Sequence, residues 1–202
     1  LHVLFRHPAA TKSRRGRAGN ADVGVRDTIP DPYRTPNPED ALMGDAVIVS
    51  TARTAIGTAR KGTLLDVSAF DLAKYAVGEA LTRSGIAHDD VDDLQMGESL
   101  QGGGDIARYA AVDLGLLNVP GVALNRHCAS GMAAVQGAAA SIRAGMDRVV
   151  IAGGAESISS SPAVMKRTLG TDDMAAWMSP SHPATPDAPA FDISLTGGLT
   201  PA

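Results

Sequence analysis

The sequence predicts an α/β fold built around a parallel-rich sheet, and the pattern of residues 46–152 carries this prediction. Short β-branched runs alternate there with longer stretches of helical apolar spacing, which is typical of consecutive βαβ units. Aromatic residues make up only 3% of the chain whereas glycine and alanine are abundant, so small aliphatic side chains must build the core. A length of 202 residues fits one domain, or one domain and part of a second.

Residues 1–42 differ from the rest of the chain in charge and in patterning. They carry seven basic and five acidic residues, whereas the whole chain has a net charge of −4. They contain five prolines and show no helical or strand periodicity, so we expect a disordered or non-native extension, with Met43 as the natural first residue. A transit peptide or a nucleic-acid-binding arm is the alternative for this Arg-rich segment. The acidic balance of the chain argues against a nucleic-acid-binding domain.

The first periodic elements are a strand at 46–49, a glycine-containing loop at 53–67 and a helix. Ser68 and Asp71 have the spacing of a capping box, apolar residues then follow a helical stripe to Leu81, and Gly85 is placed to end the helix. A second strand is expected at 93–98.

Further elements follow at the same spacing. Glycines at 102–104 predict a turn, and Asp105 can cap a helix that runs to about Leu114. A strand at 122–125, a long helix at 128–144 and a strand at 148–152 complete the alternation. Residues 161–202 are rich in proline and lack strand runs, so we expect the beginning of a loop-rich second domain.

Cys128 is the candidate catalytic residue. It is the only cysteine, which excludes an internal disulfide framework and a cysteine-clustered zinc site. It falls where a strand passes into a helix, and a helix N-terminus favours the thiolate and lowers a thiol pKa. The free backbone N–H groups there can also receive an oxyanion. The alternative is a small buried apolar side chain, which is the usual role of a lone thiol.

The predicted helix behind Cys128 is unusual in composition. Residues 128–142 contain no charged side chain and consist mostly of alanine, glycine and serine, so we expect this helix to be buried on all sides. A membrane span is the competing interpretation. The stretch is too short for one, and Arg126, Gln136 and Arg143 lie in or beside it.

Four motifs in the correct order resemble those of thiolases, the acetyl-CoA C-acyltransferases. Residues 125–132 (N-R-H-C-A-S-G-M) resemble the family's N-terminal cysteine motif, and residues 53–57 (R-T-A-I-G) resemble its R-T-P-I-G. Residues 101–108 (Q-G-G-G-D-I-A-R) resemble its Q-x-G-x-G-Q-N-x-A-R, and residues 153–159 (G-G-A-E-S-I-S) resemble its G-G-M-E-S-M-S. The resemblance covers about residues 43–160, and residues 161–202 are compatible with the start of a thiolase loop domain.

The resemblance implies the N-terminal half of a layered αβαβα fold with a buried central helix. It implies an acyltransferase of fatty acid and lipid metabolism that performs 3-ketoacyl-CoA thiolysis or acetoacetyl-CoA formation. Cys128 would be the nucleophile, acylated by the substrate, and its own N–H would form half of an oxyanion hole. Acyl-CoA and CoA are then substrates, and no cofactor, metal, nucleic acid or membrane span is expected. The full-length parent would be a cytoplasmic homodimer or homotetramer, although residues 1–42 leave organellar targeting open.

The family's other catalytic groups, an Asn in N-E-A-F, a His in G-H-P and a second Cys in C-x-G, do not occur in this sequence. We therefore expect a truncated chain that is inactive alone. His182 is expected to be a loop residue, His127 to serve loop structure or packing, and His88 to lie at the surface. A β-ketoacyl synthase-like condensing enzyme is the alternative enzyme. A truncated half that dimerises with an intact paralogue, or that has no role, is the non-catalytic alternative.

Overall fold

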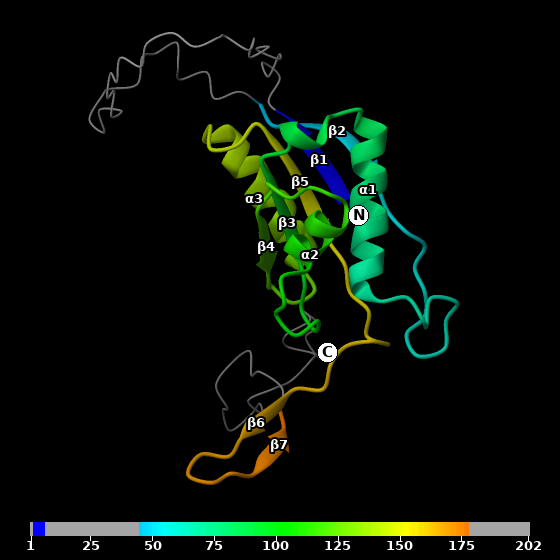
Figure 1. Cartoon of the computed structure of the whole chain (residues 1–202), viewed down its shortest axis with the longest axis vertical. Coiled ribbons are helices and arrows are strands. Elements are labelled where there is room, and N and C mark those ends of the chain that lie inside the picture. Colours follow the sequence, from blue (N-terminus) through cyan, green and yellow to red (C-terminus); the bar gives the residue numbers. More distant parts are fainter. Residues whose placement is uncertain (1, 7–44, 178–202) are drawn as a thin grey trace, which may run out of the picture.

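A computed structural model describes residues 2–6 and 45–177, which form a sheet with helices on both faces and a separate small hairpin (Figure 1). The sheet has five strands in the order β2-β1-β5-β3-β4. These strands are β2 (Val47–Ala52), β1 (His2–Arg6), β5 (Val149–Gly154), β3 (Asp93–Gly97) and β4 (Gly121–Leu124). The helices are α1 (Ala69–Ser84), α2 (Ile106–Asp113) and α3 (Ser130–Arg143), with a short 3-10 turn η1 (His88–Asp90).

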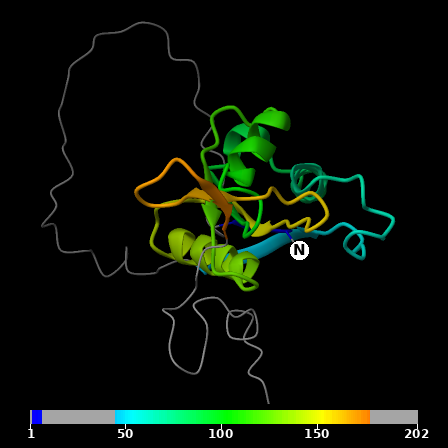
Figure 2. The same cartoon turned by 90° about the horizontal axis from the view of Figure 1, so that it is seen from below.

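The sheet separates two apolar layers, with α1 and α2 on one face and α3 on the other (Figure 2). The central strand β5 contributes buried apolar side chains to both layers. Val149 and Ile151 belong to the core with α1 and α2, whereas Val150 and Ala152 belong to the core with α3. Because successive side chains of a strand point to opposite faces, a continuous apolar run is what a doubly covered strand requires.

The expectation of a disordered or non-native segment over residues 1–42 is wrong for His2–Arg6. This segment is β1, and it lies inside the sheet, antiparallel to β2 on one side and to β5 on the other. The sheet is therefore mixed, with β3 parallel to both β4 and β5. The remaining residues of the expected extension, Leu1 and residues 7–42, lie outside the described residues, as does Met43.

The capping signals of the first two helices are confirmed. Ser68 Oγ accepts from the Asp71 N–H at 3.0 Å and the Asp71 carboxylate accepts from the Ser68 N–H at 3.3 Å, which completes a capping box at the start of α1. Gly85 ends α1 in the left-handed conformation, with φ 65°. Asp105 caps α2 by accepting from the Arg108 N–H at 3.1 Å.

Helix α3 differs from its prediction in two ways. It begins at Ser130, two residues later than expected, because residues 126–129 form a tight turn before it. It is also buried on one face only: Ser130, Ala134, Ala138 and Ile142 lie against the sheet, whereas Met132 is 63% exposed. The expectation that this helix is buried on all sides is therefore wrong for the described residues, because only the side chains that recur every four positions face the sheet.

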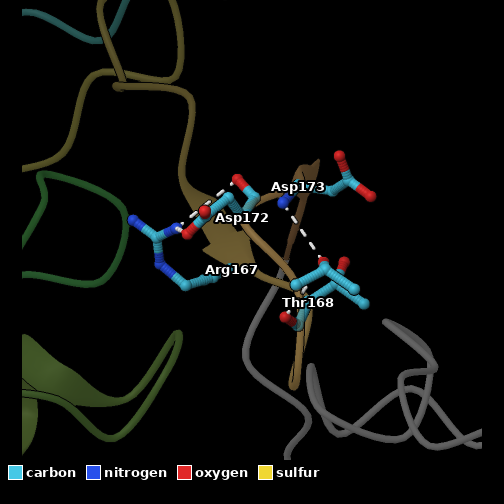
Figure 3. Close-up of polar contacts among 5 residues, drawn as sticks. Arg167, Thr168, Asp172 and Asp173 are labelled. Carbon is cyan, nitrogen blue, oxygen red and sulfur yellow. Dashed lines mark hydrogen bonds and ion pairs between the residues drawn. The ribbon is translucent and has the colours of Figure 1, made fainter.

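Two short strands interrupt the region expected to be loop-rich. β6 (Met165–Arg167) and β7 (Met174–Ala176) pair antiparallel as a hairpin that projects from the sheet (Figure 1). Near the turn of this hairpin, Arg167 forms an ion pair with Asp172 at 2.7 Å (Figure 3). The Asp173 N–H donates to Thr171 Oγ1 at 3.1 Å. Of the described helices, none is long and apolar enough to cross a lipid bilayer.

Candidate active site

The carboxyl ends of three parallel strands meet at one edge of the sheet. Gly97, the last residue of β3, is in register with Leu124 at the end of β4 and with Gly154 at the end of β5. The residues that follow each strand therefore lie together, and hydrogen bonds join them. This edge is where ligands bind in open α/β sheets, so it is the first place to look for chemistry.

Cys128 lies at this edge with an exposed side chain, in the loop between β4 and α3. The loop begins with an Asx turn, in which the His127 N–H donates to Asn125 Oδ1 at 3.0 Å. His127 then takes a left-handed conformation with φ 49°, which is uncommon for a residue other than glycine. The prediction that Cys128 follows a strand and precedes a helix is confirmed, and its catalytic role stays a prediction.

Because Gly97 has no side chain, the first turn of α3 packs directly against the end of β3. A Cβ atom at Gly97 would lie 2.4 Å from the carbonyl carbon of Ser130 and 2.5 Å from the Gly131 nitrogen. Backbone atoms cannot move aside as a flexible side chain can, so only glycine fits at this close approach. Gly97 thus places the first turn of α3, and with it the Cys128 loop, against β3.

The Glu156 carboxylate joins the ends of β3 and β5. Its Oε2 atom accepts from the N–H groups of Ser99 and Leu100, at 3.0 and 3.1 Å. Its Oε1 atom accepts from the Gln101 side-chain amide, which also donates to the Ser157 carbonyl at 3.3 Å. Two segments of the resemblance, residues 101–108 and 153–159, therefore meet beside the cysteine loop.

The remaining segment of the resemblance, residues 53–57, lies next to a cavity of about 320 Å³. The residues 53–59 form one wall of this cavity and residues 154–159 form another, and the Arg60 N–H donates to Ser159 Oγ at 2.8 Å. Cys128 does not line it. All four segments thus follow strands at the carboxyl edge of the sheet, but the exposed Cys128 side chain does not contribute to the wall of the cavity.

Sequence reasoning missed Ser99, which turns out to contact the cysteine loop. Ser99 Oγ donates to the His127 carbonyl at 3.1 Å. The available signal was positional: Ser99 follows β3, and residues after neighbouring parallel strands converge.

Two of the three histidines considered above lie in exposed turns of the described residues. His88 is exposed in η1, as expected, and His127 is an exposed turn residue. His182 lies outside the described residues. Within the described part of the chain, no cluster of His, Cys, Asp and Glu side chains could hold a metal ion.

Comparison with known proteins agrees with this geometry. The family model described as "Thiolase, N-terminal domain" matches residues 46–196. A 3-ketoacyl-CoA thiolase of Bacillus subtilis is 37% identical over 161 residues, which are 75% of this chain and 41% of that protein. An acetyl-CoA acetyltransferase of Cupriavidus necator is 40% identical over 126 residues, which are 61% of this chain and 32% of that protein.

Solved structures give the same result. The acetyl-CoA acetyltransferase of Bacillus anthracis superimposes with a TM-score of 0.58 at 34% identity, over 65% of this chain and 35% of that one. The Acat5 thiolase of Ascaris suum, solved in complex with coenzyme A, superimposes with a TM-score of 0.58 at 30% identity. The chain spans less than half the length of each of these relatives. It belongs to the thiolase family, and its α/β layers are those of the N-terminal thiolase domain.

Proposed function

We propose that this chain carries the nucleophile of an acyl-CoA acyltransferase. An acyl group passes from a CoA thioester to Cys128 Sγ, and then to CoA or to an acetyl-CoA carbanion. The observation that carries the proposal is the position of Cys128: an exposed thiol at the meeting point of three strand ends, two residues before α3.

The local backbone suits the first half of this reaction. The Cys128 thiol releases its proton to solvent, its sulfur attacks the thioester carbon, a C–S bond forms, and the carbonyl electron pair moves onto oxygen. Backbone N–H groups at a helix N-terminus stabilise such an oxyanion without reorganising. Collapse of the oxyanion then expels the CoA thiolate and leaves an acyl-cysteine.

The relatives support the reaction class through their names, which are 3-ketoacyl-CoA thiolase and acetyl-CoA acetyltransferase. The acyl-cysteine step, the use of acyl-CoA and CoA, and a role in fatty acid metabolism are proposals for this chain. A homo-oligomeric parent and a cytoplasmic location stay predictions. Turnover also needs a general base and a proton carrier, and the His, Asn and second Cys motifs of the family do not occur in this sequence. We therefore expect the chain alone to be acylated once and not to turn over acetoacetyl-CoA.

The experiment is to incubate the purified chain with acetyl-CoA and to record its intact mass, followed by peptide mapping. We expect one acetyl group on Cys128, sensitive to hydroxylamine as a thioester is. Cys128→Ala is the control, and it should stay unlabelled while its circular dichroism spectrum is unchanged. Acetylation that persists in Cys128→Ala, or a wild-type chain that folds and takes no acetyl group, contradicts the proposal.

A further inference from the structure

Three donors converge on the backbone carbonyl of His127, the residue before the nucleophile. The Ser130 N–H lies 3.0 Å from this oxygen, Ser130 Oγ lies 2.6 Å from it and Ser99 Oγ lies 3.1 Å from it. A carbonyl oxygen has two lone pairs, so three donors occupy it fully. The direction of the His127 carbonyl is therefore fixed by contacts from both α3 and the end of β3.

This carbonyl determines where the Cys128 N–H points. The His127–Cys128 peptide is trans, and in a planar trans peptide the N–H lies opposite the C=O. Ser130, which holds the carbonyl, is only 4% exposed, so the carbonyl is directed towards the protein interior. The Cys128 N–H is consequently directed away from the interior, on the side where the exposed Cys128 side chain meets solvent.

We infer that Ser99 and Ser130 are positioning residues for acyl transfer, because their hydroxyls aim the Cys128 N–H at the oxyanion that forms on the acyl group. This inference rests on the proposed function. Neither serine touches the reacting atoms; both act through the His127–Cys128 peptide.

The local backbone gives this carbonyl one restraint, the hydrogen bond from the Ser130 N–H, and the two hydroxyls add to it. His127 has φ 49°, a conformation that costs free energy for a residue with a side chain. Rotation of the following peptide would turn the Cys128 N–H away from the substrate side. Two hydroxyls on the carbonyl oppose this rotation, and the Glu156 carboxylate in turn holds the Ser99 N–H at 3.0 Å.

Two reagents that attack the same thiol separate positioning from simple reactivity. With p-nitrophenyl acetate, Cys128 Sγ bonds to the acetyl carbon through an oxyanion, p-nitrophenolate leaves and the thiol proton goes to solvent. With iodoacetamide, Sγ displaces iodide at a saturated carbon and the thiol proton again goes to solvent, so no oxyanion forms. A misdirected Cys128 N–H should therefore slow the first reaction and leave the second unchanged.

The variants are Ser99→Ala, Ser99→Thr and Ser130→Ala, with exposed Ser160→Ala as the matched control. We expect Ser99→Ala to slow acylation by p-nitrophenyl acetate roughly three- to tenfold, a fraction of the effect of losing an oxyanion donor. Ser130→Ala should slow it more, since Ser130 Oγ is the nearer of the two hydroxyls, at 2.6 Å, and also accepts from the Arg126 N–H at 2.8 Å. Ser99→Thr keeps a hydroxyl and should restore the wild-type rate. The rate of alkylation of Ser99→Ala by iodoacetamide should stay within about twofold of the wild-type rate, because this reaction forms no oxyanion for the Cys128 N–H to stabilise.

Three results would overturn the inference: equal acylation rates in wild type and Ser99→Ala, a parallel loss of acylation and alkylation, or no rescue by Ser99→Thr. Ser99→Ala keeps the test decisive if Ser130→Ala does not fold. The outcome of this test is independent of the acetyl-CoA experiment, because the reaction with p-nitrophenyl acetate does not require recognition of coenzyme A. Failure with acetyl-CoA alone overturns the proposed function, whereas an unchanged acylation-to-alkylation ratio overturns the positioning roles.

Discussion

The two flanks of the sheet are built in opposite ways. On one flank β5, β3 and β4 run parallel, are joined by helices and come from residues 93–154. On the other flank β1 runs antiparallel between β5 and β2, and it comes from the first residues of the chain. Strand β2 pairs within the described residues only with β1, so β1 alone connects it to the remaining strands.

The parallel flank holds the candidate site and repeats a local pattern, whereas the antiparallel flank depends on one distant segment. Strands β3 and β4 are each followed by a helix that packs on the sheet and leads to the next strand, so each step adds contacts between residues close in sequence. Strand β1 gains its partners only through contacts across more than 40 positions of the sequence, which cost more loop-closure entropy. Perturbing one flank at a time should therefore show how far the site depends on the other.

Removing residues 1–6 should have the largest effect. Strand β1 pairs at five positions with β2 and at four with β5, and these ladders are lost together. We expect the free energy of unfolding in urea to fall by at least about 3 kcal/mol, since net backbone hydrogen bonds contribute about 0.5–1.5 kcal/mol each. Amide exchange should rise over Val47–Ala52.

A matched pair at one position checks that pairing, and not chain length, is responsible. Leu4→Pro removes an N–H from an interior strand, whereas Leu4→Val keeps every backbone donor and introduces a β-branched side chain that suits a strand. Leu4→Pro should behave like the deletion, and Leu4→Val like the wild type. Unchanged stability after deletion would mean that β2 joins the sheet without β1.

A smaller loss is expected for Gly97→Ala on the parallel flank. The new Cβ would meet backbone atoms of Ser130 and Gly131, so α3 must shift, at a cost of about 1–3 kcal/mol for overpacking. Gly104→Ala is the control, because nothing lies within 4 Å of its Cβ position. Thermal unfolding measures both variants. If Gly97→Ala is as stable as Gly104→Ala, the close approach of α3 to β3 is wrong.

The same contrast explains how much could be predicted from the sequence. The capping box at Ser68, the cap at Asp105 and the glycine at 85 are local chemistry, so α1 and α2 were predictable to within a few residues. The position of Cys128 between a strand and a helix was predictable because a short apolar run precedes it and a run of small residues with helical spacing follows it.

The misses have physical reasons. The short apolar run of residues 3–5 within β1 has no periodicity that distinguishes a strand from a tail, and its partners lie far away in sequence. Ser99 was missed because its partner, the His127 carbonyl, is brought near only by the parallel pairing of β3 with β4.

The smallest effect concerns Asp92, which joins β3 to the start of β5. Its carboxylate accepts from the N–H groups of Arg148 and Val149 at 2.7 and 2.9 Å and pairs with the Arg148 guanidinium at 3.1 Å. Partial burial raises the pKa of Asp92, but these hydrogen bonds and the Arg148 charge outweigh it and hold the pKa below its ordinary value of 3.8. A lowered folded-state pKa stabilises the fold above the unfolded pKa, and this contribution is lost as pH falls through the folded pKa.

Asp92→Asn keeps an acceptor for the backbone N–H groups but loses the charge, so we expect a loss of about 0.5–1.5 kcal/mol at neutral pH. The difference from wild type, measured by urea unfolding at several pH values, should be constant down to about pH 5 and shrink at more acidic pH. Arg148→Gln in the Asp92→Asn background should add little, because the two share one interaction. A difference that grows as the solution is acidified would show that the Asp92 carboxylate does not stabilise the junction of β3 and β5 through its charge.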